Sequence, residues 1–312
     1  MKHSHTETIL ITGVAGFLGR YIARHFHRKG CVVIGTDNST PENAPTGNLN
    51  SYHQMRLPDP DFGRLLESVQ PTILVHCAGR AAVALSVENP HSDFYSNAVV
   101  TFEILDAVRQ YAPACRTIFL SSAAVYGNPE KLPIVESCLP SPVSPYGFHK
   151  LQSEQLCAEF SKIYNLKTAS VRIFSAYGPG LRRQVIWDIC QKAILNNELI
   201  LQGTGEESRD FIHALDIANA IDCITNKAEM NGEFYNLATG EEVKIRSLVE
   251  LVLESLEIEK QPEFNGIVSA GVPLNWRADI SSLRSLGFES TVAFDRGIKT
   301  FAYWCRAELL GV

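Results

Sequence analysis

The strongest constraint on the fold is a series of short apolar runs that alternate with helical patterns through the first two-thirds of the sequence. Each run holds four to six residues without polar alternation. Such runs are typical of strands buried on both faces of a sheet, and intervening helices make neighbouring strands parallel. We therefore predict an α/β fold with a doubly wound parallel sheet. The runs cover residues 9–12, 32–35, 73–77, 118–121 and 169–174.

The length of the chain favours two structural lobes. It has 312 residues, more than a single hydrophobic core usually serves. Beyond about residue 178 the pattern changes to shorter segments with turn clusters at 203–207 and 238–241. We predict a Rossmann domain over residues 1–177 and a smaller C-terminal α/β lobe over residues 178–312. Some segments of the second part are expected to return to the first.

The charge balance argues against several partners. The formal net charge is −6, the sequence pI is about 5.9, and the Lys and Arg residues are scattered. These values favour neither nucleic acid nor a membrane surface. The first strand begins within about eight residues of the start, leaving no room for a secretion signal, and no apolar run approaches the ~20 residues that span a bilayer. We expect a cytoplasmic protein.

The cysteines do not suggest a metal site. There are eight, widely spaced, with no CxxC pair and no histidine at zinc-ligand spacing. We predict no metal and no disulfide framework.

A glycine triplet follows the first predicted strand and opens the first predicted helix. Gly13, Gly16 and Gly19 stand in TGVAGFLG. Glycines there let the backbone approach a pyrophosphate, whose charge is stabilised by free N–H groups and the positive end of the helix dipole. This position favours a dinucleotide site; a tight turn that needs glycine for a positive φ angle is the alternative.

Asp37 closes the second predicted strand, eighteen residues after Gly19. A carboxylate there can accept hydrogen bonds from the adenosine ribose hydroxyls and would repel a 2′-phosphate. No Arg or Lys occurs between Asp37 and Asn50. We therefore predict NAD over NADP as cofactor; a capping or turn role for Asp37 is the alternative.

Tyr146 and Lys150 stand four residues apart in SPYGFHK. On a helix they would share one face, about 6 Å apart along the axis, and the upstream Pro142 and Pro145 favour a helix start. A lysine ammonium beside a phenol favours the phenolate and should lower the tyrosine pKa toward the range of general acid and base catalysis. An ordinary surface pairing is the alternative.

Ser121 and Ser122 end the fourth apolar run and are followed by AAVYG. Because the carboxyl ends of parallel strands border the ligand crevice, a hydroxyl here can hydrogen-bond a substrate oxygen beside the tyrosine. A plain turn at the strand end is the alternative.

Together these motifs resemble those of the extended short-chain dehydrogenases/reductases, in particular the NAD-dependent nucleotide-sugar epimerases, dehydratases and reductases. The resemblance covers essentially the whole chain, and it rests on the order and spacing of the motifs. They are GVAGFLG, Asp37, HCAG at residues 76–79, Asn97, SSAAVYG, Tyr146 with Lys150, and RDFIH at residues 209–213.

The resemblance implies roles for the matching residues and a nucleoside-diphosphate sugar as substrate. It makes Ser122, Tyr146 and Lys150 a catalytic triad, and Arg209 matches an arginine that grips the pyrophosphate in relatives. Residues 178–312 would mainly bind the sugar nucleotide. The implied substrate contacts are Ser122, Ala123, Ser175 and Arg209. The implied NAD contacts are Gly13, Gly16, Phe17, Leu18, Gly19, Asp37, Asn38, Ala78, Gly79, Asn97, Tyr146 and Lys150.

Ala123 and Ala124 bear on the reaction. The similar 4,6-dehydratases carry Asp-Glu at these positions, and the uronic-acid decarboxylases carry glutamate at the second. Elimination of water needs an extra acid and base, which methyl groups cannot supply. The SSAAVYG run is more similar to the 4-epimerases, in which the tyrosine deprotonates the sugar 4-hydroxyl, C4 loses a hydride to NAD, and the hydride returns to the opposite face of the 4-keto sugar.

Departures from the family pattern leave the sugar open. Ser175 stands where relatives often have a substrate-contacting asparagine, and a common adenine-contacting aspartate after the third strand is replaced near Arg56. Many epimerases also have a second phosphate-contacting arginine just before the segment matching residues 272–279, and none is seen here. The candidates to replace it are Arg182, Arg183 and Arg277, although an arginine of this kind is more often simply a solvated cation.

We therefore expect an NAD-dependent epimerase of a nucleoside-diphosphate hexose. The alternative is a reductase of a 4-keto-6-deoxyhexose nucleotide, which needs the same three residues but consumes reduced cofactor. Asp37 favours the epimerase, because many such reductases resemble NADP users. A non-catalytic sensor or scaffold is a third possibility, against which the intact Tyr-x-x-x-Lys pair argues.

The resemblance also implies a homodimer through a four-helix interface, built from the helices after Asn97 and Lys150. Its candidate residues, which could equally belong to the core, are Phe102, Leu105, Leu151 and Leu156.

Overall fold

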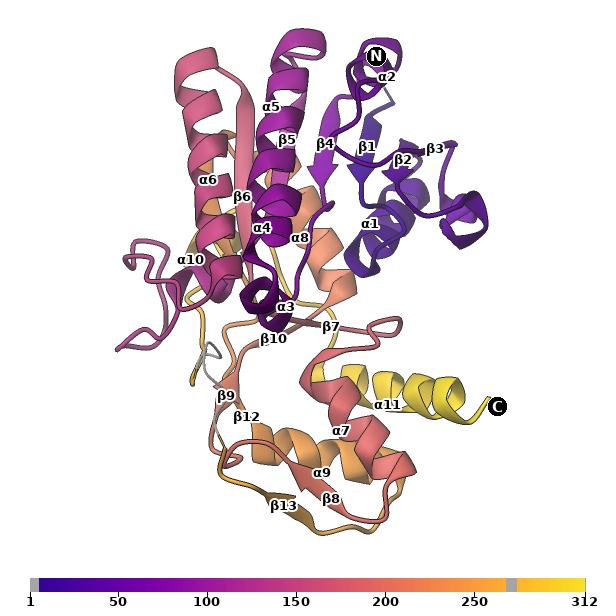
Figure 1. Ribbon diagram of the computed structural model, residues 1–312, viewed down its shortest axis with the longest axis vertical. Helices are drawn as coiled ribbons and strands as arrows, with labels where there is room; N and C mark the ends of the chain where they lie inside the picture. Colours follow the sequence, from indigo (N-terminus) through magenta and orange to yellow (C-terminus); the bar gives the residue numbers. More distant parts are fainter. Residues whose placement is uncertain (1–5, 268–273, 312) are drawn as a thin grey trace.

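The centre of the structure is a seven-stranded sheet (Figure 1). The computed structural model describes residues 6–267 and 274–311. The strand order is β11-β6-β5-β4-β1-β2-β3, and every neighbouring pair is parallel. This confirms the predicted doubly wound α/β fold. The strands are β1 (Thr8–Thr12), β2 (Val32–Asp37), β3 (Ser51–Gln54), β4 (Ile73–His76), β5 (Arg116–Ser122), β6 (Lys167–Ile173) and β11 (Asn231–Leu237).

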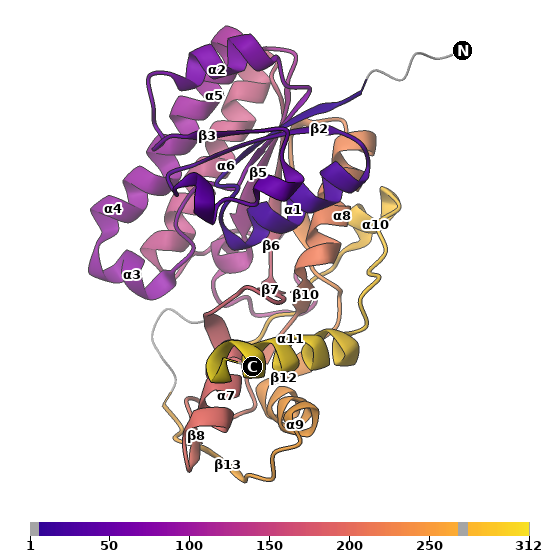
Figure 2. The same ribbon diagram turned by 90° about the vertical axis from the view of Figure 1, so that its right-hand side faces the viewer.

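Helices cover both faces of the sheet (Figures 1 and 2). α1 and α8 enclose one hydrophobic core, which receives Ile9 and Ile11 of β1. α2, α5 and α6 enclose a second core, which receives Leu10. The alternation follows from the period of two in a strand, which sends successive side chains to opposite faces. These helices are α1 (Phe17–Arg28), α2 (Phe62–Val69), α5 (Val100–Tyr111), α6 (Pro145–Tyr164) and α8 (Ala214–Lys227).

Short elements lie around the carboxyl ends of the strands. α3 and α4 follow β4 and pack against α6, and a 3-10 turn follows β5. Two further 3-10 turns occupy the loop after β2. These elements are η1 (Pro41–Asn43), η2 (Thr46–Asn48), α3 (Val83–Glu88), α4 (Pro90–Phe94), the π-helical η3 (Tyr95–Val99) and η4 (Ala123–Tyr126).

The rest of the chain builds a smaller lobe with its own core, below the sheet in Figures 1 and 2. α7, α9 and α11 pack around Ile189, Leu248 and Phe301. Three two-stranded ladders, β7 with β10, β9 with β12 and β8 with β13, complete it. The elements are β7 (Ser175–Tyr177), α7 (Gln184–Leu195), β8 (Leu199–Leu201), β9 (Ser208–Arg209), β10 (Phe211–His213), β12 (Val243–Lys244), α9 (Ile245–Leu256), β13 (Pro262–Phe264) and α11 (Phe294–Leu310).

Segments after residue 178 also return to the main sheet. α8 packs on α1, β11 extends the sheet beside β6, and α10 (Ser281–Ser285) contacts β11. Within the described residues, no helix is both long and apolar enough to cross a membrane.

Candidate active site

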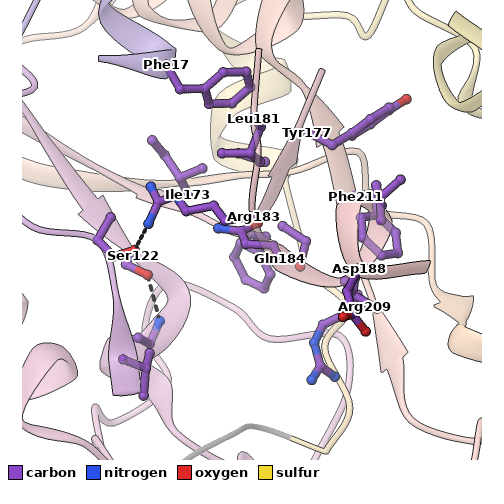
Figure 3. Close-up of a pocket in the computed structure, with 18 of the residues that line it drawn as sticks. Phe17, Ser122, Ile173, Tyr177, Leu181, Arg183, Gln184, Asp188, Arg209 and Phe211 are labelled. Atoms are coloured by element: carbon purple, nitrogen blue, oxygen red, sulfur yellow. Dashed lines mark hydrogen bonds between the residues drawn. The ribbon is translucent and has the colours of Figure 1, made fainter. Parts of the chain in front are cut away.

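A cleft of about 920 Å³ lies between the carboxyl ends of the strands and the smaller lobe (Figure 3). Its walls come from the turn after β1, the ends of β4, β5 and β6, the start of α6, and the segments β7, α7 and β9. Parallel sheets place their ligand sites at this edge.

The glycine turn forms one end of the cleft. Gly13, Gly16 and Gly19 line it together with Phe17 and Leu18. Gly13 has a φ of 68°, and a Cβ there would lie 2.7 Å from the Ala78 nitrogen. A Cβ on Gly19 would lie 2.4 Å from the Gly13 carbonyl oxygen. The packing of the turn itself therefore requires glycine at residues 13 and 19, and all three glycines line the cleft at the start of α1, where a dinucleotide pyrophosphate would be stabilised.

Asp37 lies beside this turn because β2 neighbours β1 in the sheet. Its Oδ2 accepts a hydrogen bond from the Ala15 nitrogen at 3.1 Å, and its Oδ1 accepts one from the Ser39 nitrogen at 2.9 Å. Asn38 is exposed, and neither Asp37 nor Asn38 is among the cleft-lining residues.

The segment after β4 forms the next part of the wall. Gly79 lines the cleft, and the Ala78 nitrogen donates to Thr12 Oγ1 at 3.2 Å. Asn97 is 1% exposed and lies behind Gly79, since a Cβ on Gly79 would meet Asn97 Oδ1 at 2.8 Å. Asn97 therefore supports the wall and does not itself line it.

Ser122, Tyr146 and Lys150 all line the cleft. Ser122 is the last residue of β5, and its Oγ accepts a hydrogen bond from the Ala124 nitrogen at 3.2 Å. α6 starts at Pro145, and the Ser144 side chain caps it by accepting from the Gly147 nitrogen at 3.2 Å. The first turns of α6 thus present Tyr146 and Lys150 beside the end of β5.

Burial dominates the electrostatics of the pair. It raises the pKa of Tyr146, a hydrogen bond from Ser122 and the charge of Arg183 act in the opposite direction, and the charge of Asp93 raises the pKa further. Burial also lowers the pKa of Lys150 to about 8. The Lys150 Nζ lies 5.9 Å from the centroid of the Tyr146 ring. The prediction that Lys150 lowers the tyrosine pKa was therefore wrong for this geometry: burial raises that pKa, and the groups that act against burial are Ser122 and Arg183, not Lys150.

Arg209 lies on β9 at the opposite end of the cleft. Its Nη1 donates to the carbonyl oxygens of Ser208 at 2.7 Å and Leu274 at 3.0 Å. Burial lowers the pKa of Arg209 to about 10. A half-buried guanidinium held by backbone carbonyls is well suited to an anionic ligand group.

Comparison with known proteins places the chain in a family. Residues 9–238 match the sequence model described as the NAD dependent epimerase/dehydratase family. The chain belongs to this family. The recognition made from the motifs is confirmed, and with it NAD as the cofactor of the family.

Individual relatives resemble the chain over nearly its full length. A putative UDP-glucose 4-epimerase of Methanocaldococcus jannaschii is 29% identical over 96% of this chain and 98% of its own length. The UDP-glucose 4-epimerase of Thermus thermophilus, solved in complex with NAD, is 28% identical, with a TM-score of 0.87 and coverage of 96% and 99%. MoeE5, solved with UDP-glucose and NAD, is 26% identical, with a TM-score of 0.88 and coverage of 97% and 99%.

Ala123 does not lie where the epimerase resemblance implied. It is fully buried and packs with Val125 and Trp276, whereas Ala124 lines the cleft. The turn η4 begins at this point and directs the first alanine into the core. The predicted substrate contact at Ala123 was wrong, and Ala124 is the residue that faces the ligand space.

Of the three arginines that could supply a second phosphate contact, only Arg183 lines the cleft. Arg183 lines the cleft, donates to the carbonyl oxygen of Ala81, and extends toward the end of β5 (Figure 3). Arg182 pairs with Glu308 at 2.6 Å, and Arg277 is exposed and donates to Gly240. The segment just before residue 272, where relatives carry the second phosphate-contacting arginine, lies outside the described residues.

Further polar residues of the cleft were not found from the sequence. Asp188 and Lys192 of α7 both line it, and Lys192 Nζ lies 2.9 Å from Asp188 Oδ2. Arg80 and Glu207 line it too, and so does Ser175, which was predicted. The only sequence signal for Asp188 and Lys192 was their i, i+4 spacing, which is common on exposed helices.

Proposed function

We propose that this chain is an NAD-dependent 4-epimerase acting on the hexose of a nucleoside-diphosphate sugar. The observation that carries the proposal is that Ser122, Tyr146 and Lys150 line one cleft with the glycine turn, while Ala124 offers no acid or base there. Residues 178–312 would mainly hold the sugar nucleotide. The names of the relatives reported above, which are UDP-glucose 4-epimerases or a protein bound to UDP-glucose, support the same class.

The cofactor would occupy the end of the cleft formed by the glycine turn. Gly13, Gly16 and Gly19 would hold the pyrophosphate at the start of α1, and Asp37 would accept hydrogen bonds from the adenosine ribose. Bound NAD supplies a reversible hydride acceptor for C4 of the sugar.

The sugar nucleotide would lie along the rest of the cleft. Arg209 would bind the diphosphate, and Arg183, the one arginine of the three candidates that lines the cleft, would supply a second guanidinium. Charged hydrogen bonds of this kind are about twice as strong as neutral ones. Ser175 would contact the substrate from β7.

Tyr146 would be the acid and base of the reaction. Its phenolate would take the proton of the 4-hydroxyl as the C4 hydrogen leaves as hydride. After the 4-keto sugar has turned over, it would return that proton to O4 as the hydride returns to C4. The Ser122 hydroxyl and the Arg183 guanidinium both act to lower the pKa of the phenol. Ser122 would also hydrogen-bond O4, and Lys150 would hold the tyrosine end of α6 against β5.

We also propose a homodimer through α5 and α6. Phe102 and Tyr164 are 42% and 47% exposed, and both rings pack on the buried Phe160, so they form one apolar patch across the two helices. Of the other predicted interface residues, Leu105 is 1% exposed and Leu151 and Leu156 are partly buried against the cores. Phe102→Glu should give a monomer by light scattering, and Leu139→Glu, at a residue that is 85% exposed, is the control.

The test of the function is a panel of nucleoside-diphosphate sugars incubated with the NAD-loaded protein. Mass spectrometry and NMR should detect the interconversion of one pair of C4 epimers without added reductant. Stoichiometric consumption of reduced cofactor with a 4-keto-6-deoxy sugar nucleotide, and no epimerisation, would support the reductase in its place.

A further inference from the structure

Two contacts join the α3–α4 segment to the first turns of α6. The Tyr146 nitrogen donates a hydrogen bond to Ser86 Oγ of α3 at 3.1 Å. One turn further along α6, His149 Nδ1 lies 2.6 Å from Asp93 Oδ2 of α4. The His149 ring also packs edge-on against Phe94, with centroids 5.3 Å apart. The start of the helix that carries Tyr146 and Lys150 is therefore fixed from outside by α3 and α4.

Asp93 is unusual for a buried carboxylate. It is 1% exposed, and its Oδ1 has no hydrogen-bond partner among the described residues. No Arg or Lys in that part of the chain pairs with it, whereas the nearby Glu154 pairs with Arg172 at 2.7 Å and accepts from Ser121 at 2.5 Å. A buried charge without a matching cation is costly, and such sites are more frequent where function needs them.

We propose that Asp93 is a positioning residue for the Tyr146–Lys150 pair, acting through its contact with His149, which stands between the two on α6. The inference rests on the proposed function, because it takes Tyr146 and Lys150 to carry the reaction. His149 Nδ1 donates and Asp93 Oδ2 accepts, so the contact resists rotation of the first turns of α6. That rotation would change the position of the phenol relative to Ser122 at the end of β5.

The charge of Asp93 adds a second effect. Burial lowers the pKa of Lys150, and Asp93 is the largest influence that raises it again, ahead of Cys77, Glu154 and Cys157. Burial raises the pKa of both thiols, so they stay neutral, and Arg172 matches the charge of Glu154. His76 and Tyr146 are two further titratable groups near Lys150. Asp93 is thus the anion that favours the protonated form of Lys150.

Substitutions can distinguish the hydrogen bond to His149 from the effect of the Asp93 charge on Lys150. Asp93→Asn keeps an oxygen acceptor for His149 but removes the charge. The alkaline limb of the kcat profile should then move to lower pH by roughly 1 unit, the smaller end of the effect of a neighbouring charge. His149→Leu keeps the charge but removes the donor, so kcat should fall several-fold at every pH while the limb stays in place. His149→Asn, whose amide nitrogen can replace Nδ1, should restore most of kcat.

The matched control is Asp222→Asn. Asp222 also contacts a histidine, with its Oδ2 3.3 Å from His25 Nε2, but between α1 and α8 on the other face of the sheet. It should leave kcat and its pH profile unchanged. KM and bound NAD should stay constant in all variants, and melting temperatures check that each is folded.

Two results would overturn this inference while the wild type remains active, so that the proposed function stands. One is an alkaline limb that does not move in Asp93→Asn. The other is an equal loss of kcat in His149→Leu and His149→Asn. A wild type that epimerises no sugar nucleotide of the panel overturns the proposed function, and this inference with it.

Discussion

The Nζ of Lys150 donates a hydrogen bond to the carbonyl oxygen of Leu120 at 2.9 Å. Leu120 lies on β5 two residues before Ser122, so this bond joins the helix that carries the lysine to the strand that carries the serine. Lys150 is 6% exposed, and its ammonium also faces the Phe119 ring at 4.7 Å from the centroid. The lysine thus orients two elements of the candidate site in addition to carrying charge.

Tyr146→Phe should lower turnover by at least the ~100-fold that loss of general acid/base catalysis typically costs. Tyr146 lines the cleft and is 7% exposed, and phenylalanine differs from it only by the hydroxyl, so the variant should keep the fold. Turnover with a C4-epimeric substrate and titration with NAD measure the two effects. Activity within a few-fold of the wild type would remove Tyr146 from the mechanism.

The pH profile should show an alkaline limb set by Lys150. Burial lowers its pKa to about 8, so the ammonium predominates below that pH and the neutral amine above it. Because the contact of Lys150 with the Phe119 ring needs the ammonium, the lysine should be held less firmly, and kcat should fall, as pH rises through about 8. Lys150→Arg keeps its charge to far higher pH, so any activity left in that variant should show no such limb. A wild-type profile that stays flat well into the alkaline range would contradict this role.

Asp37 should decide between the two nicotinamide cofactors. A 2′-phosphate would meet its carboxylate, and NADP would lose the charged hydrogen bonds to the ribose, each of which is worth about 1.5–3 kcal/mol. Asp37→Asn keeps an acceptor for the Ala15 nitrogen but removes the charge, so it should reduce the ratio of NAD affinity to NADP affinity. Arg20, whose Nε donates to the Ala15 carbonyl oxygen at 2.8 Å, is then the nearby cation. Fluorescence titration with both reduced cofactors measures the ratio; tighter NADP binding by the wild type would contradict the assignment.

The sequence predicted the interior strands of the sheet and missed its edges. The five apolar runs became β1, β2, β4, β5 and β6, each paired on both sides. β3 and β11 are the edge strands, with the sequences SYHQ and NGEFYNL, and most of their side chains are only partly buried. Edge strands need no continuous apolar run, so the periodicity that reveals a buried strand is absent from them.

Local turns and long-range pairs explain the errors within the site. Ala123 and Ala124 are chemically identical, and only the turn η4 decides which one enters the core. Arg182 and Arg183 are adjacent, but only Arg183 lines the cleft. Arg182 instead forms an ion pair with Glu308, which is 126 residues away in the chain. Asp93 belongs to no motif and His149 is a variable position of Tyr-x-x-x-Lys, and their contact depends on how α4 packs against α6.

Arg209 and Arg183 should matter for the sugar nucleotide and not for NAD. Alanine at either position should weaken sugar-nucleotide binding by about 1.5–3 kcal/mol, which is about 10- to 150-fold in Kd. Arg182→Ala is the matched control, since that side chain pairs with Glu308 outside the cleft and should change neither affinity. Calorimetric titration with a nucleoside-diphosphate sugar and with NAD gives both constants. Equal losses for the two ligands would indicate a structural role.

The fate of the C4 hydrogen separates the epimerase from the reductase. If Tyr146 removes and returns one proton while the hydride leaves and returns to C4, the net oxidation state of NAD does not change. Deuterium placed at C4 of the substrate should then remain at C4 of the product, and absorbance of reduced nicotinamide should show no steady change. Ala124→Glu tests the same logic from the cleft wall: a carboxylate alone, without the partner that dehydratases carry at residue 123, should not create dehydration. Loss of deuterium to solvent during epimerisation would show that the hydrogen leaves as a proton, and the hydride mechanism proposed for this cleft would be wrong.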